Sequence, residues 1–531
     1  MGKEISAFQK TQVSKQKKII SFFLVATFLI VWNFTRCSPY NRLKRDIKTV
    51  SQFNLLDTRS PFLKVHMLDG RVYILSAWKV DDKDKTVSGM GSLLDINRNL
   101  IQKSNFTISL DGVAIFETNV VKSSPYIGTM AIITLPSLAL SAYCATNPKA
   151  CFGSCPTFYA WDGEKMALQA EGFSASVTPS LENRDIDALY RVKPLSHDFE
   201  IRVTNEALET HVIRYANILA LPRPSNGRTF ATSSGKFWQA PEIVEPTACT
   251  APEGDCLAAI RFFDGIERFS KTDSKDLATR ETIELVFDSP PGGKVGLVLG
   301  FRQTLLTTYL FYQGLAYMGR ASGYWLAKME RGDKNVKKYS SRLGEVLGGI
   351  EIFAQENNDN WVLAGEIRET GPIASDARVV PLPELNSFSG KIRLRLTCGL
   401  WRIDYIALAK LSTPAEPLRL LPSSVLRGDT AVDKAKKSLS ELSDVLVTMP
   451  GDAYTLIYDL PSDYQNYELF LESQGYYIEW IRPSWLTEEN HNKTLMMFTN
   501  PAGFLKEIAP EFKKVESQME EIFWRSKYVQ K

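Results

Sequence analysis

Three cysteines lie close together in the segment YCATNPKACFGSC and are the sharpest candidates for chemistry in this chain. They are Cys144, Cys151 and Cys155. A zinc site favours two closely spaced ligand pairs, whereas the first spacing here is too wide and no fourth ligand lies nearby. A thioredoxin-like site needs C-x-x-C, and a c-type haem needs a histidine where Pro156 stands. A structural disulfide is therefore favoured over free buried thiols and over metal or redox chemistry. No cofactor is predicted.

A second pair of cysteines, Cys249 and Cys256, brackets the polar loop CTAPEGDC. Such a loop can bring two sulfurs together as a hairpin disulfide, which persists only in an oxidising compartment. The chain has seven cysteines, so lipidation of Cys37 would leave an even number for pairing. This parity favours export together with lipidation. The alternative is a cytosolic protein whose thiols are all free.

Four acidic residues are candidates for hydrolytic chemistry: Glu171, Glu182, Asp185 and Asp187. Hydrolysis of a polysaccharide would need two carboxylates that flank a cleft. Acidic residues among arginines and lysines usually form a solvated face, however, and the sequence has no G-x-S-x-G, H-E-x-x-H or P-loop motif. We therefore predict no catalytic residue. No metal ligand is predicted either, because the histidines are scattered: His66, His197, His211 and His491.

Aromatic side chains near the end of the body are candidates for a binding surface, because interface hot spots favour Trp, Tyr and Arg. The candidates are Trp401, Arg402, Tyr476, Tyr477, Trp480 and Trp485. Nucleic acid is not an expected partner, because the net charge is only +3 and no basic patch with interleaved aromatics occurs. The expected partner is a protein or a glycan.

An uncharged run from Ile19 to Trp32 follows the lysine-rich segment KQKK and predicts a membrane anchor. Residues 1–18 form the expected cytoplasmic tail, and residues 19–36 form a signal anchor or a lipoprotein signal. A cleaved signal peptide is a further alternative, because a spanning helix needs about 20 apolar residues and a signal-peptide core about 7–15. Arg36 departs from the lipoprotein pattern before Cys37. Both flanks are basic, so charge bias alone does not set the orientation.

The body reads mainly as short strands, with Asp-Gly turns at Asp69, Asp111 and Asp162. Its length implies about two to four domains. We expect several antiparallel β-sandwich or barrel domains behind the membrane anchor. The predicted units are a small β domain at 55–135, a β domain with the cysteine cluster at 140–230, a jelly-roll-like sandwich with an inserted helix at 231–411, and a β segment with a C-terminal helix at 412–531.

Two helices are expected within this β-rich body. Leu305, Tyr309 and Tyr312 recur at helical spacing in a polar-interrupted apolar segment, which predicts a buried helix rather than a second membrane span. Near the end of the chain, Phe512 and Met519 share one face of an amphipathic pattern. That helix is expected to dock on the body.

Several segments together resemble a family of uncharacterised bacterial cell-envelope proteins, many of them apparent lipoproteins. The matching segments include CFGSCPTFYAWDG, LLTTYLFYQGLAYMG and GLWRIDYIALA. The resemblance implies export and residence in the cell envelope, with the body outside the cytoplasm, but it carries over no activity and no functional residue. The segment from GKIRLRL to GLWRIDYIALA also resembles the closing strands of galactose-binding-like jelly rolls.

These observations favour a membrane-anchored envelope protein that binds or scaffolds without catalysis. The alternative is a hydrolase acting on envelope polysaccharide, and a third hypothesis is a redox or metal protein built on the cysteine cluster.

Overall fold

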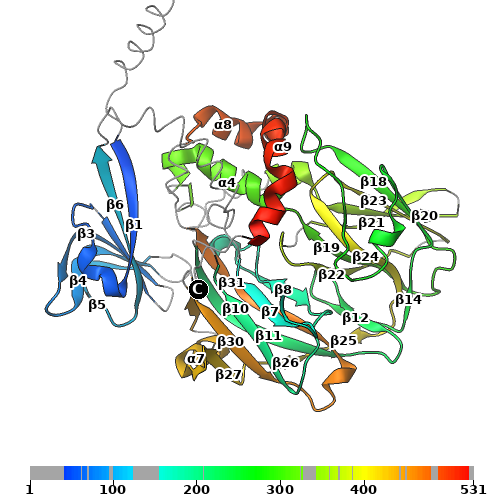
Figure 1. Ribbon diagram of the computed structural model, residues 1–531, viewed down its shortest axis with the longest axis horizontal. Coiled ribbons are helices and arrows are strands. Elements are labelled where there is room, and N and C mark those ends of the chain that lie inside the picture. Colours follow the sequence, from blue (N-terminus) through cyan, green and yellow to red (C-terminus); the bar gives the residue numbers. More distant parts are fainter. Residues whose placement is uncertain are drawn as a thin grey trace, which may run out of the picture.

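The computed structural model describes most of the chain after residue 40. The described residues are 41–60, 62–67, 71–94, 100–123, 155–206, 209–322, 325–326, 342–357, 359–368, 371–384, 387–441, 444–448, 451–479 and 488–525. Within them the strands form mainly antiparallel sheets (Figure 1), which confirms the predicted β-rich fold class. In these ranges no helix combines the length and the apolar character needed to cross a membrane. The predicted tail, anchor and Cys37 lie outside the described residues.

The first strands form a six-stranded antiparallel sheet in the order β1-β6-β2-β3-β4-β5. Alternate residues along them, such as Val65, Leu75 and Phe116, are buried in one small core. The predicted Asp111-Gly112 turn is present, and Gly112 has a φ of 88°, which glycine adopts without strain. This sheet begins before the predicted start at residue 55, because β1 pairs with β6. The elements are β1 (Asn41–Thr49), the 3₁₀ helix η1 (Val50–Leu55), β2 (Phe62–Met67), β3 (Val72–Asp81), β4 (Thr86–Leu94), β5 (Leu100–Ser109) and β6 (Val113–Ser123).

Two further sheets, called sheets B and C, pack face to face around a core that includes Phe158, Ile201 and Leu471. Sheet B has the order β28-β27-β30-β10-β7-β8, and sheet C has the order β26-β11-β31-β9, with β29 also on β11. Sheet B contains β7 (Thr157–Trp161), β8 (Met166–Glu171), β10 (Asp198–Thr204), β27 (Ser424–Arg427), β28 (Thr430–Ala431) and β30 (Ala453–Asp459). Sheet C contains β9 (Asn183–Ala188), β11 (Glu209–Pro222), β26 (Leu418–Leu420), β29 (Leu446–Thr448) and β31 (Tyr467–Glu479).

Both sheets combine strands from 155–222 with strands from 418–479, so the predicted boundary at residue 411 does not separate two units. The longest pairing joins β11 to β31 from Glu209↔Glu479 to Pro222↔Tyr467. The predicted C-terminal β segment therefore completes the sheets that the cysteine-cluster segment begins.

Sheets D and E share one core and form a second sandwich, with strands from 228 to 415. Sheet D has the order β14-β24-β19-β22-β12-β13-β25, with β17 on β24, and sheet E has the order β16-β15-β18-β23-β20-β21. Ile392 and Leu394 of β23 are buried as their alternation predicts, and they share a core with Leu297 of β19. Sheet D contains β12 (Arg228–Ala231), β13 (Phe237–Ala240), β14 (Glu242–Val244), β17 (Arg268–Phe269), β19 (Val295–Gln303), β22 (Asp376–Pro381), β24 (Trp401–Lys410) and β25 (Pro414–Ala415). Sheet E contains β15 (Ala248–Ala251), β16 (Gly254–Asp255), β18 (Arg280–Val286), β20 (Ile350–Glu356), β21 (Trp361–Ile367) and β23 (Phe388–Thr397).

The predicted buried helix is present as α4 (Leu306–Met318), inserted between β19 and β20. It is apolar around most of its circumference, which is typical of a helix that is covered on every side. It ends at Gly319, which has a φ of 53°. Figure 1 shows α4 beside α8 (His491–Thr499) and α9 (Pro501–Arg525). Phe512 and Met519 of α9 are buried, which confirms that the C-terminal helix docks on the body.

Short helices complete the described elements. The helix α7 (Asp433–Ser440) has Ala435 and Leu439 buried against the core between sheets B and C. The remaining 3₁₀ helices are η2 (Pro179–Leu181), η3 (Leu257–Ala259), η4 (Gly319–Ala321) and η5 (Tyr464–Asn466).

The predicted hairpin disulfide between Cys249 and Cys256 is present, and it joins the ends of the β15–β16 hairpin. Both sulfurs are buried in the core between sheets D and E. Cys155 is a free buried thiol, so the prediction that it belongs to a disulfide is wrong. Cys144 and Cys151 lie outside the described residues.

Removing the disulfide should destabilise the second sandwich. The double variant Cys249→Ala/Cys256→Ala should lower the free energy of unfolding by about 2 kcal/mol, because the bridge restricts a short loop in the unfolded chain. Urea unfolding with and without dithiothreitol measures this. The reductant should weaken the wild type and leave the variant unchanged; equal effects on both would contradict the assignment.

Candidate functional site

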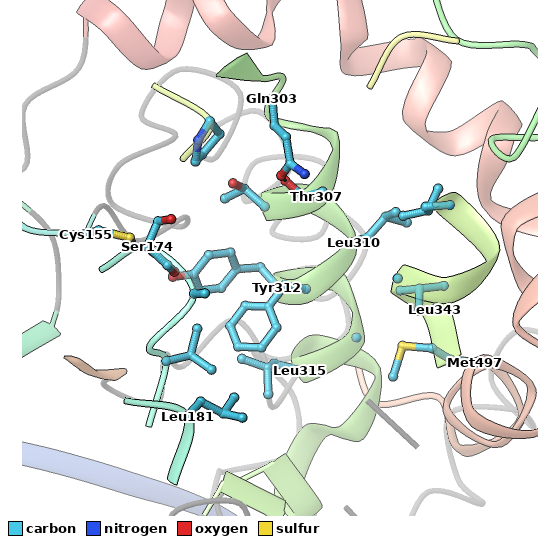
Figure 2. Close-up of a pocket in the computed structure, with 18 of the residues that line it drawn as sticks. Cys155, Ser174, Leu181, Gln303, Thr307, Leu310, Tyr312, Leu315, Leu343 and Met497 are labelled. Carbon is cyan, nitrogen blue, oxygen red and sulfur yellow. Dashed lines mark hydrogen bonds between the residues drawn. The ribbon is translucent and has the colours of Figure 1, made fainter. Parts of the chain in front are cut away.

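A cavity of about 530 Å³ lies between α4 and the ends of sheets B and C. Figure 2 shows α4 crossing this cavity, with Tyr312 extending toward Cys155 and Ser174, and with Leu310, Leu343 and Met497 grouped on the other side of the helix. Most of the lining is aliphatic or aromatic, and the polar groups come from a few positions. This combination of apolar walls with few polar groups is typical of small-molecule sites.

The polar part of the wall contains Cys155, Ser174, Glu171 and Tyr477. The Cys155 thiol donates to the carbonyl oxygen of Ser174 over 3.6 Å, and the Tyr477 hydroxyl donates to the same oxygen over 3.1 Å. Burial and the nearby carboxylates of Glu171 and Glu209 raise the pKa of Cys155 well above its usual range. The thiol is therefore protonated at neutral pH and is a poor nucleophile.

Glu171, the last residue of β8, places its carboxyl group in the cavity wall although only 3% of the residue is exposed. Its Oε2 accepts a hydrogen bond of 2.9 Å from the backbone nitrogen of Ile373. A Cβ added at Gly371 would lie 2.2 Å from the same oxygen, so only glycine lets the loop approach this closely. Burial raises the pKa of Glu171 to about 7, against lowering by backbone and Cys155 hydrogen bonds. The carboxyl group therefore exchanges its proton near neutrality.

The loop that covers Glu171 is held by a buried ion pair. The Nε of Arg302 lies 2.6 Å from Oε1 of Glu267, and its Nη1 donates to the carbonyl oxygen of Pro372 over 2.8 Å. Arg302 lies in β19 one residue before Gln303, the last residue of that strand, which lines the cavity beside the start of α4. One strand of sheet D thus fixes both the covering loop and the helix.

A second group of buried acids lies at the junction of sheets C and D. Asp185 and Asp187 of β9 face Asp376 of β22, and the one guanidinium among them belongs to Arg378. Its Nε lies 2.5 Å from Oδ2 of Asp376, and its Nη2 lies 3.8 Å from Oδ1 of Asp185. Burial and then the neighbouring carboxylates raise the pKa of Asp187 well above its usual range. These acids were predicted to be solvated, so that prediction is wrong.

The remaining predicted acid, Glu182, is also not solvated. Arg214 pairs with it through both carboxylate oxygens, and both side chains are mostly buried. Buried carboxylates such as those of Glu182 and Glu171 are met by an arginine or by backbone donors.

The predicted aromatic binding surface is not formed by the residues that the structure describes. Trp401 and Tyr476 are 1% and 0% exposed, and Tyr477 is also buried, so the prediction is wrong for these three. They pack into the cores because they lie on inward-facing positions of β24 and β31. Arg402 stacks over Phe269 at 3.9 Å from the ring centroid and pairs with Glu267. Trp480 and Trp485 lie outside the described residues.

Histidine and cysteine do not assemble into a metal centre within the described ranges, where no group of three potential ligands is found. His211 and Glu209 are both fully buried, with Nε2 3.2 Å from Oε2. Next to this pair in sheet C, the Tyr477 ring is perpendicular to the His211 ring. This pair supports the cavity wall from behind, through Tyr477.

Sequence reasoning named Glu171 but placed it on a solvated face, and it missed Tyr312 and Gln303 as cavity residues. The polar side chains that interrupt the apolar helix segment were the available signal, because a buried helix retains polar groups where they have a partner or a ligand.

No family model matches the chain, and no curated protein matches it. Among solved structures, the chain is similar to the crystal structure of the GH31 alpha-xylosidase from Xanthomonas citri, with 8% identity and a TM-score of 0.14. The match covers 76% of this chain and 37% of that chain, so this chain spans well under half of the enzyme's length. A TM-score this low carries no argument for a shared fold or activity.

Glu171 should make the stability of the protein fall as pH rises. The folded protein keeps a proton on this group up to about pH 7, whereas the carboxyl group ordinarily loses it near 4.5. The contribution of protonated Glu171 to the free energy of unfolding is thus complete below pH 4.5, and it is lost as the pH rises through 7. From pH 5 to 8, the unfolding free energy should fall about 2–3 kcal/mol more in the wild type than in Glu171→Gln. Urea unfolding at pH 5 and at pH 8 tests this. The control variant Glu164→Gln changes an exposed turn residue, and its unfolding free energy should change with pH as that of the wild type does.

Arg378 should be essential at neutral pH because it compensates several buried carboxylates. Arg378→Met should lower the free energy of unfolding by about 3–5 kcal/mol at pH 8, the usual cost of an uncompensated buried charge. The loss should shrink at pH 5, where the acids with raised pKa values take up protons. Arg393→Met, which breaks the exposed pair with Glu284, should cost under about 1 kcal/mol at either pH. Equal losses for the two variants in urea unfolding would contradict this role.

Proposed function

We propose that this chain is a membrane-anchored, non-enzymatic binding protein of the bacterial cell envelope, and that it holds a small, mainly apolar ligand in the cavity beside α4. The observation that carries the proposal is the cavity itself. Its volume of about 530 Å³ lies within the range of about 300–1,000 Å³ that is usual for ligand sites.

The chemistry of the walls supports binding rather than catalysis. Phe311, Leu315 and Met497 line the cavity with apolar surface. The Cys155 thiol is kept protonated by burial, which removes the most reactive candidate nucleophile. The polar groups are suited to orienting one end of a ligand while the apolar walls provide the affinity.

A location outside the cytoplasm is part of the same proposal. The Cys249–Cys256 disulfide supports it, because such bridges persist in oxidising compartments. The uncharged run at residues 19–32 supports membrane attachment. The proposed partners are the membrane, through the N-terminus, and a protein or glycan that this binding unit serves.

Polysaccharide hydrolysis is the weaker proposal. Glu171 and Glu345 both line the cavity, which gives it two carboxylates. A saccharide, however, needs many hydrogen-bonding partners, and these walls are mainly apolar. A hydrolase would lose its activity on envelope glycans in Glu171→Gln, whereas a binding protein has none to lose.

Filling the cavity should block binding. Thr308 lines the cavity from α4, and Thr308→Trp would place an indole ring in the space that the ligand occupies. The full chain in phosphatidylcholine nanodiscs is exposed to a diazirine-bearing dodecanol, and labelled peptides are mapped by mass spectrometry. We expect saturable labelling of α4 and α8 in the wild type and at least about tenfold weaker labelling in the variant, because the lost apolar contact is worth about 0.8 kcal/mol per methylene.

The matched control is Thr430→Trp, which adds the same side chain at an exposed threonine of β28. It should label as the wild type does, and circular dichroism should show all three proteins folded. Labelling of α4 that does not saturate, or that Thr308→Trp leaves unchanged, would overturn the proposal.

A further inference from the structure

The cavity wall contains the carboxyl group of Glu171. Ile373 and Ala374 donate backbone hydrogen bonds to Glu171, and the Cys155 thiol is its other hydrogen-bonding neighbour. Among the described residues, no lysine or arginine forms an ion pair with it. The basic residue that also lines the cavity, Arg368, is mostly exposed and pairs with Glu366 at 2.9 Å. Glu171 therefore differs from buried acids such as Glu281, Glu468 and Glu472, which have arginine partners.

The surroundings of Glu171 add negative rather than positive potential. Asp185 and Asp187 interact with it electrostatically from β9. Their own compensating charge, Arg378, lies at the junction of sheets C and D, in contact with Asp376. A cation that entered the cavity would thus meet one unpaired carboxylate backed by further acids. An anion would meet repulsion.

Two tyrosines line the same cavity as Glu171. Tyr477 lines the polar part of the wall, and Figure 2 shows Tyr312 reaching from α4 toward Cys155 and Ser174. The faces of such rings attract ammonium groups within about 6 Å of the centroid. A carboxylate and tyrosine rings in the wall of one mainly apolar cavity are the groups that recognise an alkylammonium ion.

We infer that the cavity selects an amphiphile with a basic nitrogen, whose ammonium group pairs with Glu171 and whose apolar chain lies along α4. This inference rests on the proposed binding function and names its ligand class. The ammonium group of the ligand supplies the positive charge that Glu171 otherwise lacks, so the ligand and the carboxylate together form an ion pair. A neutral amphiphile of equal length fits the same walls but leaves the carboxylate uncompensated.

The test compares three competitors that differ only in their polar end. Dodecylamine, dodecanol and dodecanoate are titrated against the diazirine-bearing dodecanol on the full chain in phosphatidylcholine nanodiscs at pH 8. We expect dodecylamine to displace the probe at a concentration at least tenfold lower than dodecanol, and dodecanoate to be the weakest. Glu171→Gln should abolish the amine's advantage and leave the midpoint for dodecanol within about threefold.

Glu164→Gln is the matched control, because Glu164 is an exposed carboxylate in the turn between β7 and β8 and is not part of the cavity lining. It should keep the amine's advantage. Equal potency of amine and alcohol on the wild type, or an amine advantage that Glu171→Gln retains in full, would overturn this inference and leave the proposed function standing. Failure of every competitor to displace the probe would overturn both.

Discussion

The pairing of β11 with β31 is the constraint on which the rest of the body depends. Thirteen-residue β31 lies along β11 from its first residue to its last, although the two strands are far apart in the sequence. The pairing brings the C-terminal part of the chain into sheet C, places Tyr477 in the cavity wall, and leads the chain toward α8 and α9. Because β11 is buried along nearly its whole length, a shift in this register would expose apolar residues and break every later contact.

The buried charges follow from the same stacking of sheets. Where sheet D meets sheet C, β9 and β22 bring three aspartates and Arg378 together, and the arginine offsets part of their mutual repulsion. Where the end of β8 meets the loop after β21, Glu171 receives backbone donors, and none of the arginines that the structure describes forms an ion pair with it. The fold thus tolerates an incompletely compensated acid at the wall of the cavity. Departures from good packing and pairing of this kind concentrate at functional sites.

Local sequence patterns predicted the local structure well. The turns at Asp111 and Asp162, the alternation in β23, the apolar segment of α4 and the CTAPEGDC loop each depend on residues that are neighbours in the chain. The pairing of β11 with β31 depends on residues that are remote in sequence, and alternation shows which face of a strand is buried without showing what covers it. For this reason Glu171 and Asp187 were expected in water, and Trp401 was expected on a surface.

The same reasoning explains why the candidate site was only partly foreseen, and why its energetics favour binding. A carboxyl group whose pKa is raised by burial weakens the folded state at neutral pH, because the protein must either hold a proton or bury a charge. A ligand that stabilises the charged form removes this cost only when it is bound, so its binding is coupled to the stability of the whole junction. An arginine paired with Glu171 would have stabilised the carboxylate in the protein without ligand, and a ligand could then have added no charge compensation. The proposed ligand would therefore give the carboxyl group of Glu171 the positive partner that the described residues do not supply.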